Sequence, residues 1–482
     1  MPTSPNTDTN APIVVIGGGI SGLACAHRLQ KDGFAVLLLE SSPRFGGVLD
    51  TVEKEGFLFD IGPQSFLATE PLMTLIEDLG LGGELLRADP RAPRYILLSG
   101  RLVPAPLGPA SLIRTPLISW RTKLRLVSEP LGRTHPPEGD ESIANFVRRK
   151  FGEDLLTNLA GPFISGVYAG DPEKLSLESA FPIARRLEQR YGSLIRGAIK
   201  MRRQGGGGPR PPLCNFRKGT VTLVSALTAA LADSAQPGAP VASIAQRAQA
   251  PGEPASFDVT YQDGIATRSL AASAIVLATP AQQAAGLLRG IAPSFPDLLS
   301  QIEYAPVAQV AAGYRLSQIS RFSAATSAGP SASSARGFGF LVPRTEGLRL
   351  LGTVWNSFLF PGRAPEISEK MVSFTSFVGG ATDPEITRQP EDAIAALVHK
   401  ELSAVLAITG LPVAQHVARW ERALPQYNLG HPQIIASLAE LCAHSPGLFL
   451  TGNYLSGPSL GSCVEHAHNT AAAVAHFLRA QT

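Results

Sequence analysis

The sequence is poor in cysteine and in long apolar runs. Four of its 482 residues are cysteines, and they lie far apart with no Cys-x-x-Cys pair: Cys25, Cys214, Cys442 and Cys463. A disulfide framework or a structural zinc site is therefore not expected, and the protein is expected in a reducing compartment. No apolar run reaches the roughly 18 residues of a membrane-spanning helix. The N-terminal segment MPTSPNTDTNAP has neither the basic nor the apolar region of a secretory signal.

The net charge is also low. The 42 Lys and Arg residues exceed the 39 Asp and Glu residues by three, and no block of basic residues stands out, so nucleic-acid binding is not expected. A hydrophobic fraction of 44% with 17% charged residues is typical of a folded globular protein. The length predicts two or three domains.

The N-terminal segment predicts a strand, a tight turn, a helix and a second strand. Short apolar runs at Ile13–Ile16 and Ala35–Leu39 are typical of strands buried on both faces of a parallel sheet, and Ser21–Lys31 has helical spacing. The runs Ala274–Ala278 and Leu448–Thr451 have the same buried character. We expect them to be later strands of the same sheet, so that the first domain is discontinuous.

Three segments rich in Pro, Gly and Ser predict loops: 203–212, 249–256 and 325–337. The second connects Val241–Gln246 to Phe257–Tyr261, which together predict a hairpin. One long helix is predicted at Glu391–Ile408.

The turn after the first strand matches G-x-G-x-x-G at Gly17, Gly19 and Gly22. The first glycine permits the tight turn, the second lets a pyrophosphate approach the backbone, and the third lets helix and strand pack closely. The helix N-terminus offers unpaired N–H groups to phosphates. Glu40 follows the second strand, where its carboxylate can accept hydrogen bonds from ribose hydroxyls. This context favours a dinucleotide site over a solvated glycine turn.

The segments that follow favour FAD over NAD. SSPRFGGVLDT brings Arg44 and the paired Gly46 and Gly47 behind the second strand, and GFLFDIGPQSF (56–66) supplies another glycine turn. The pattern E-x-x-x-R-x-G-G resembles the flavin-containing amine oxidase superfamily. Arg44 would add positive charge near the pyrophosphate, the alternative being a surface salt bridge. Val48 departs from the superfamily, which often has Arg or Lys there.

Later motifs resemble the oxygen-dependent protoporphyrinogen oxidase family. They are PFISGVYAGDPEKLSL (162–177), GFGFLVP (337–343), LLGTVWNSFLFPGRAP (350–365), FVGG (377–380) and the C-terminal LFLTGNYLSGPSLGSCVEHAHNTA (448–471). The resemblance runs from about Ile13 to Leu478. It implies an α/β fold with an FAD-binding Rossmann-type domain, an inserted α+β substrate domain and a helical membrane-binding domain. The implied ranges are 11–89, 206–290 and 425–482 for the discontinuous FAD-binding domain, 90–205 for the helical domain and 291–424 for the substrate-binding domain.

The resemblance also implies a reaction, the six-electron oxidation of a porphyrinogen, with oxygen reoxidising a noncovalent FAD and yielding hydrogen peroxide. No catalytic side chain is assigned, because the flavin carries the chemistry. The residues implied for cofactor binding are Gly17, Gly18, Gly19, Ile20, Ser21, Gly22, Glu40, Ser41, Arg44, Gly46, Gly47, Val48, Gly62, Pro63, Gln64, Ser65, Val241, Trp420, Asn453, Pro458, Ser459 and Leu460. Cys463 is expected to be a packed helix residue, and His466 and His468 partly exposed helix residues without a metal.

A broad apolar substrate with carboxylates at its edge needs apolar walls and a cation at the rim. In the family Leu341, Val354 and Phe377 fall at the walls, and Arg94 falls where an arginine meets a propionate. Backbone around Gly166 and Gly170 would approach the ring. Without the resemblance, the three apolar residues are ordinary packing residues and Arg94 an ordinary surface arginine.

Alternative functions remain open. Protoporphyrinogen IX is favoured, but some relatives prefer coproporphyrinogen III. An amine oxidase or carotenoid desaturase shares the early motifs, although an aromatic fraction of 7% offers little for an amine cage. A flavoprotein acting as a membrane-attached binding subunit is a further alternative. The segment around Trp120 alternates apolar residues with Arg and Lys, which suits a helix pair at a lipid surface or packed within the protein. The family also implies a cytoplasmic location on the inner face of the membrane, a homodimer and transfer to the next enzyme of the haem pathway.

Overall fold

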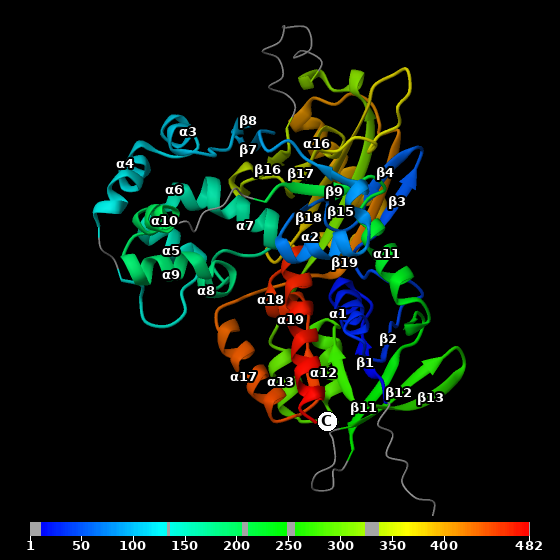
Figure 1. Ribbon diagram of the computed structural model, residues 1–482. Helices are drawn as coiled ribbons and strands as arrows, with labels where there is room; N and C mark the ends of the chain where they lie inside the picture. The colour runs from blue at the N-terminus through cyan, green and yellow to red at the C-terminus, as the bar shows by residue number, and fades with distance from the viewer. Residues whose placement is uncertain (1–10, 133–134, 205–210, 248–255, 323–336, 482) are drawn as a thin grey trace, which may run out of the picture.

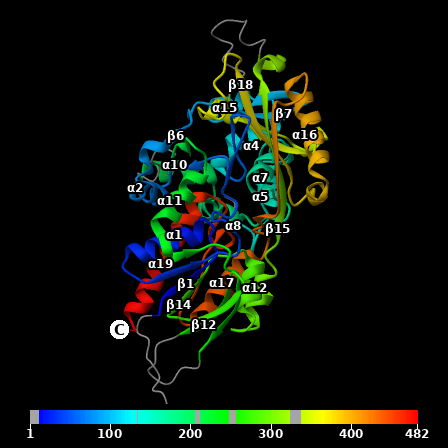
Figure 2. The ribbon, with the colours of Figure 1, turned by 90° about the vertical axis from the view of Figure 1, so that its right-hand side faces the viewer.

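A computed structural model describes residues 11–132, 135–204, 211–247, 256–322 and 337–481. The predicted loops 203–212, 249–256 and 325–337 lie largely outside the described residues. The chain forms a nucleotide-binding unit, a large mixed sheet in which all pairings but that of β16 (Gly339–Leu341) with β7 (Arg94–Leu98) are antiparallel, and a helical unit that projects from their junction (Figure 1). Turned by 90°, the nucleotide-binding unit and the large sheet lie end to end (Figure 2).

The nucleotide-binding unit is built on a five-stranded parallel sheet with β1 at its centre. Its strands, in spatial order, are β10 (Ala235–Gln236), β2 (Val36–Leu39), β1 (Ile13–Ile16), β14 (Ala274–Leu277) and β20 (Leu448–Leu450). All four pairings are parallel. The prediction that four separate apolar runs form one sheet is confirmed. The carboxyl ends of these strands meet at one edge, where parallel α/β sheets bind their ligands.

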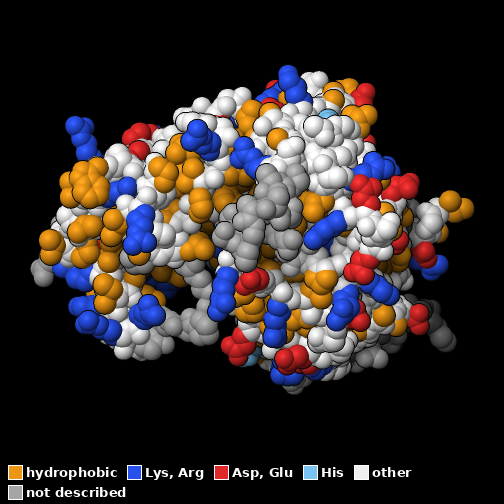
Figure 3. Space-filling model, turned by 90° about the horizontal axis from the view of Figure 1, so that it is seen from above, with side chains coloured by type: hydrophobic (Ala, Val, Ile, Leu, Met, Phe, Trp, Pro, Cys, Tyr) orange, Lys and Arg blue, Asp and Glu red, His pale blue; other side chains and the backbone are white. Residues whose placement is uncertain are grey.

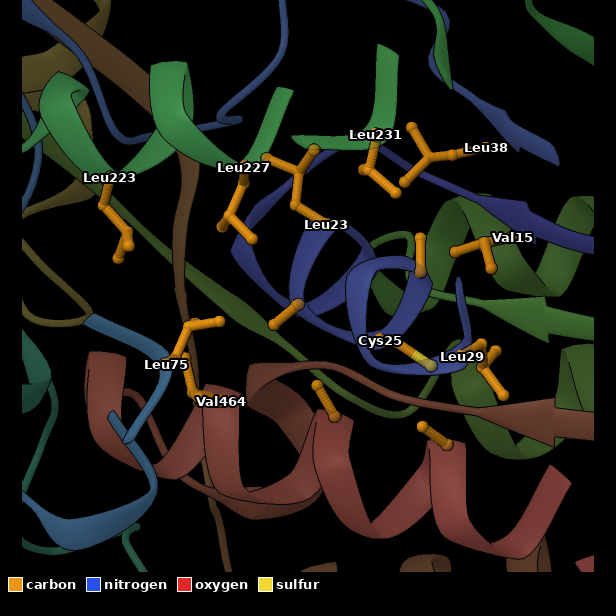
Figure 4. Packing of buried hydrophobic residues seen from close by; sticks show 14 of the residues in the cluster. Val15, Leu23, Cys25, Leu29, Leu38, Leu75, Leu223, Leu227, Leu231 and Val464 are labelled. Atoms are coloured by element: carbon orange, nitrogen blue, oxygen red, sulfur yellow. The ribbon is translucent and has the colours of Figure 1, made fainter. Parts of the chain in front are cut away.

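Helices cover both faces of this sheet. On one face α1 (Ile20–Lys31) lies between α11 (Val221–Leu231) and α19 (Leu460–Arg479), and Leu23, Cys25 and Leu29 of α1 point into the shared core (Figure 4). The opposite face packs against α12 (Ala281–Leu288), α13 (Ser294–Leu299), α17 (His431–Ala443) and a three-stranded sheet of β11 (Val241–Gln246), β12 (Phe257–Asp263) and β13 (Ala266–Ala272). Antiparallel β11 and β12 confirm the two strands of the predicted hairpin.

The large sheet has seven strands. In spatial order they are β19 (Ala414–Pro425), β15 (Tyr304–Arg315), β18 (Met371–Gly379), β17 (Leu350–Val354), β16 (Gly339–Leu341), β7 (Arg94–Leu98) and β8 (Arg101–Pro104). One face packs against α16 (Glu391–Leu406), which confirms the predicted long helix, and is rich in aromatic side chains around the buried Trp355. The other face is turned toward the loops of the nucleotide-binding unit.

Two short sheets join these units. The first is the hairpin of β3 (Thr51–Lys54) and β4 (Phe57–Asp60), and the second contains β5 (Phe66–Leu67), β9 (Leu213–Phe216) and β6 (Leu85–Arg87). Helix α2 (Glu70–Asp78) follows β5 and packs on α19. The loop 61–65 runs from β4 to β5 and is therefore fixed at both ends by sheet structure.

The helical unit contains the short helices between β8 and β9. They are α3 (Pro109–Arg114), α4 (Trp120–Ser128), α5 (Ile143–Lys150), α6 (Glu153–Leu155), α7 (Gly161–Tyr168), α8 (Leu177–Ala180), α9 (Pro182–Tyr191) and α10 (Leu194–Arg203). A buried ion cluster holds them together, in which the Lys150 ammonium lies 2.9 Å from the Glu188 carboxylate and Arg149 pairs with both Glu188 and Glu141. Within the described residues, no helix is long and apolar enough to cross a membrane.

The structure moves two of the expected domain limits. Strands β7 and β8 fall in the range 90–205 expected for the helical domain, but they hydrogen-bond to β16 in the large sheet. Helix α13 falls in the range 291–424 expected for the substrate domain, but Phe295 and Leu299 pack in the core of the nucleotide-binding unit. Both differences arise because sheet partners and core neighbours distant in sequence decide where these segments belong.

Candidate cofactor and substrate site

The first turn has the geometry predicted for its three glycines. Gly17 has φ +107°, and a Cβ there would lie 2.9 Å from the carbonyl carbon and oxygen of Ala278, at the end of β14. A Cβ on Gly22 would overlap the carbonyl oxygen of Gly17, so this glycine permits the close helix–strand contact. Gly19 differs, because its φ of −71° and ψ of 176° suit any residue and no atom of the described chain lies within 4 Å of an added Cβ.

The open space beside Gly19 therefore shows whether the turn can accept a dinucleotide. The protein's own packing does not require glycine at this position, whereas a pyrophosphate lying against the backbone would. Helix α1 begins at Ile20, so its N-terminal N–H groups lie next to this open position. A ligand that needs the space beside Gly19 accounts for the glycine, and the residues present fit FAD.

Glu40 lies directly after β2 and is buried. Its Oε2 accepts a hydrogen bond from Gly18 N at 2.6 Å, and its Oε1 accepts from Ser42 N at 2.7 Å and from the Ser41 hydroxyl at 3.3 Å. A carboxylate has about four acceptor positions, so it can still accept from a ribose hydroxyl. Ala239 N donates to the main-chain oxygen of Glu40 at 2.7 Å, which brings the chain leading into Val241 beside the same residue.

The loop 44–50 covers the first turn. Gly46 N donates to Gly18 O at 2.8 Å, and both Gly46 and Gly47 have positive φ, at +106° and +59°. The Arg44 guanidinium donates to Gly47 O at 2.8 Å and lies 3.6 Å from the Asp50 carboxylate. An ion pair at Arg44 is thus present, while its role near the pyrophosphate stays a prediction. Val48 is exposed beside these glycines.

The loop 61–65 is held from the large sheet. Trp420 of β19 donates its indole N–H to Ile61 O at 3.0 Å, and Gln309 of β15 donates to Gly62 O at 2.7 Å. The buried Gln64 donates to Gly62 O at 2.9 Å and to the carbonyl of the residue that ends β4. A Cβ on Gly62 would overlap the Val48 carbonyl oxygen, so the two loops lie in contact. Pro63 and Ser65 lie on the same loop.

The C-terminal segment meets the same place. Ser459 caps α19 by accepting from Ser462 N at 3.0 Å, and Pro458 and Leu460 flank that cap. A Cβ on Gly461 would lie 2.5 Å from the Thr69 hydroxyl oxygen, just after β5. Asn453 begins α18 (Asn453–Ser456), and its carbonyl accepts from the Tyr427 hydroxyl at 2.5 Å. The N-terminal ends of α1 and α19 and the loop 61–65 therefore converge.

Cys463 is buried in α19, which confirms it as a packed helix residue. Burial raises the pKa of its thiol to about 11, so the thiolate that a covalent flavin link would require is scarce at neutral pH. His466 and His468 are partly exposed on the same helix, as predicted, and burial lowers the pKa of each. Within the described ranges, no three His, Cys, Asp or Glu side chains are placed to hold a metal ion.

The three predicted wall residues lie on one face of the large sheet. Leu341 of β16 is in register with Gly352 of β17, Gly352 with Phe377 of β18, and Phe377 with Gln309 of β15. Residues in register share a face, so Leu341 and Phe377 lie on the face from which Gln309 reaches the loop 61–65. Val354, two residues beyond Gly352, shares that face. All three predicted residues are partly exposed, unlike the fully buried opposite face.

Helix α7 approaches this row from the helical unit. A Cβ on Gly166 would overlap the Leu341 side chain, and a Cβ on Gly170 would lie 2.5 Å from Leu175 and 2.8 Å from the Gln426 side-chain oxygen. Packing within the protein thus accounts for both glycines, while the approach of the backbone around them to a ring stays a prediction. The same helix face exposes Phe163 and Val167. Sequence reasoning missed these two, although their spacing of four residues beside Gly166 was available.

Arg94 begins β7 and is exposed, and its guanidinium stacks 5.1 Å from the centre of the Phe338 ring. Gly339 of β16 is in register with both Arg94 and Val354, so the cation lies on the wall face at its outer end. Two surface hollows lie elsewhere. One of about 400 Å³ lies between α13 and α17, and one of about 330 Å³ is lined by residues 357–371.

Comparison with known proteins identifies the family of this chain. The sequence profile of flavin containing amine oxidoreductases matches residues 20–475. The chain belongs to this family. It is an FAD-dependent oxidoreductase, and the resemblance to protoporphyrinogen oxidases is confirmed by relatives that align over nearly the whole chain.

A protein of Oryza sativa subsp. japonica named protoporphyrinogen oxidase, chloroplastic, is 35% identical over 99% of this chain and 90% of its own length. A Bacillus subtilis protein named coproporphyrinogen III oxidase is 30% identical over 95% of this chain and 97% of its own. A crystal structure from Exiguobacterium sp. 255-15 shares the fold, with a TM-score of 0.78, 24% identity and coverage of 97% and 99%. Cyclohexylamine oxidase from Brevibacterium oxydans has a TM-score of 0.66 at 17% identity, covering 98% and 100%.

Proposed function

We propose that this protein oxidises protoporphyrinogen IX to protoporphyrin IX. The observation that carries the proposal is the apolar row of Leu341, Val354 and Phe377, partly exposed on the sheet face that also holds the loop 61–65. Such a wall beside a flavin suits a broad, apolar substrate better than a small cation. The 35% identity to a plant protein named protoporphyrinogen oxidase supports the same substrate.

The reaction removes six electrons and six protons from the macrocycle in three rounds. A bound FAD would supply a two-electron acceptor for the hydride removed in each round and a route for two electrons and two protons to oxygen, which would leave as hydrogen peroxide. The chain's own part is to bind, orient and exclude water. The apolar row and Phe163 would pack against the faces of the macrocycle, and Arg94 would pair with a propionate at its edge.

Turnover of both porphyrinogens, measured side by side as the growth of porphyrin fluorescence in air, tests the proposal. We expect a higher kcat/KM for protoporphyrinogen IX, with one hydrogen peroxide formed per two electrons removed. A preference for coproporphyrinogen III would support the alternative that the 30% identity to the Bacillus subtilis protein suggests. Oxidation of amines or carotenes alone would favour the other family activities. A yellow protein that oxidises none of these would support a binding role.

The proposal includes attachment to a membrane surface through the helical unit. Trp120, Leu124, Val127 and Leu131 recur at helical spacing along α4 and the turn after it, with exposed fractions of 67, 56, 65 and 86%. Exposed basic side chains, including those of Arg121 and Arg125, lie on the same helix. At that end of the molecule hydrophobic surface (orange) alternates with Lys and Arg (blue) in Figure 3. An exposed apolar stripe flanked by basic groups suits the interface of an anionic bilayer.

Co-sedimentation with liposomes tests this attachment. Replacing Trp120 and Leu124 together by Asp should reduce binding to vesicles that contain anionic lipid at least tenfold. Ile265→Asp is a matched control, because Ile265 is fully exposed on the distant β12–β13 turn. Equal binding of both variants would contradict the attachment.

Location at the cytoplasmic face of the membrane, a homodimer and transfer of the porphyrin to a following enzyme complete the proposal. They rest on the family resemblance alone. Sedimentation equilibrium of the purified chain tests the dimer, for which a mass near 102 kDa, twice the 50.8 kDa of one chain, is expected.

A further inference from the structure

A buried ion pair lies directly behind the loop 61–65. Arg363 follows α15 (Asn356–Leu359) in the substrate-side part of the chain, and Asp60 ends β4 in the first of the two short sheets that join the units. The side chains of both are 0% exposed, and Arg363 Nη2 lies 3.5 Å from Asp60 Oδ2. Two charges so far from solvent persist only when paired and hydrogen-bonded.

Each partner is further held by groups of the two short joining sheets and of the turn before α11. Asp60 Oδ1 accepts from Thr220 N at 2.8 Å and from the Thr51 hydroxyl at 2.8 Å, and Oδ2 accepts from Asn215 Nδ2 at 2.8 Å. The Arg363 guanidinium donates to the carbonyls of the two residues that end and follow β9, at 2.8 and 3.1 Å. The pair therefore joins the substrate-side segment to β4 and β9 at one point.

The same network continues into the loop. Asn215 Nδ2 also donates to Gln64 O at 2.8 Å, and Asn356 Nδ2 donates to Gln64 Oε1 at 2.6 Å. The loop 61–65 is therefore connected to Arg363 in two ways. Asn356, in the same segment as Arg363, contacts the loop at Gln64, and Asp60, the ion-pair partner of Arg363, directly precedes the loop. Movement of Arg363 would be passed to the loop through both of its ends.

We propose that Arg363 is a positioning residue, which through Asp60 and Gln64 holds the loop 61–65 in the place where it contacts the bound flavin. Trp420 and Gln309 hold the loop from the sheet, and Arg363 and Asn356 hold it from the opposite segment. The charge of Arg363 is compensated within the network, so its part is to fix geometry and not to contact substrate. The inference depends on FAD binding and not on which substrate is oxidised.

Titration of flavin-stripped protein with FAD, followed by flavin fluorescence, tests the proposal without any substrate. Arg363→Met should weaken FAD binding at least tenfold and alter the fine structure of the 450 nm absorption band in the reconstituted protein. Arg363→Lys keeps the charge but not the fork that reaches two carbonyls, so an intermediate affinity is expected. Asp60→Asn should resemble Arg363→Met.

Lys150→Met is the matched control, because Lys150 forms an equally buried ion pair with Glu188 in the helical unit, away from the loop. It should lower the thermal midpoint and leave FAD affinity and the absorption band unchanged. Wild-type affinity and spectrum in folded Arg363→Met would overturn the proposal, as would an equal loss of affinity in Lys150→Met. Failure of both the Met and Lys variants at 363 to fold would also overturn it, because Arg363 would then serve folding alone.

Discussion

Gly19 and Gly22 belong to one motif, yet an added methyl group should act on them in opposite ways. At Gly22 it would overlap the Gly17 carbonyl oxygen and lie 3.1 Å from Ala278 Cβ, so β1 and α1 would have to separate. At Gly19 it would meet no atom of the described chain. Alanine at position 22 is therefore a test of protein packing, and alanine at position 19 a test of ligand contact.

The magnitudes follow from these contacts. Overpacking against backbone costs about 1–3 kcal/mol, and the better helix propensity of Ala offsets roughly 1 kcal/mol of it at Gly22. At Gly19 the backbone suits Ala, which gains about 0.4–1 kcal/mol through the unfolded state and loses a similar amount as a poorer N-cap. We therefore expect Gly22→Ala to destabilise the flavin-free protein and Gly19→Ala to change its stability by less than about 0.5 kcal/mol.

FAD affinity should separate the two variants further. A methyl group at Gly19 would push the pyrophosphate from the helix N-terminus and weaken one charge-assisted hydrogen bond, worth about 1.5–3 kcal/mol. That corresponds to a loss of about 10- to 150-fold in affinity. Differential scanning fluorimetry of the flavin-free proteins and fluorescence titration with FAD measure the two effects. Unchanged FAD affinity in Gly19→Ala would refute the reasoning, and so would an equal loss of flavin-free stability in both variants.

Three further outcomes are expected. Glu40→Gln replaces a carboxylate that accepts two backbone N–H bonds, so FAD affinity and flavin-free stability should both fall, the latter by about 1–3 kcal/mol in thermal unfolding. Burial lowers the pKa of His431 in the folded protein, so the stability that its neutral imidazole contributes is fully present above the unfolded pKa of about 6.5 and is lost as pH falls below that value. His431→Gln should therefore flatten the acid side of a plot of the unfolding midpoint against pH. Gly166→Ala would meet only the far end of the flexible Leu341 side chain, so it should displace Leu341 and raise the porphyrinogen KM with little change in the unfolding midpoint; a large fall in the midpoint with unchanged KM would count against a place for Leu341 in the substrate wall.

The nucleotide-binding unit could be predicted well from the sequence. Four of its five strands, β1, β2, β14 and β20, are largely buried and parallel, so each is a short apolar run that can be recognised alone, and the glycine pattern of the first turn is local in the sequence. The bounds of β1, α1 and α16 differ from those predicted by two residues at most. The wall residues were available only through the family resemblance, because a half-buried Leu or Phe carries no local signal.

Tertiary structure decided everything that depends on distant partners. The assignment of β7 to the large sheet, the packing role of Gly166, and the buried pair of Asp60 with Arg363 each join segments that are far apart in the chain. Local patterns report what a residue does to its neighbours in sequence, such as turning the chain or repeating every two or four positions. They cannot report which carbonyl, carboxylate or methyl group the fold brings against it, and those contacts decide where the loop 61–65 lies.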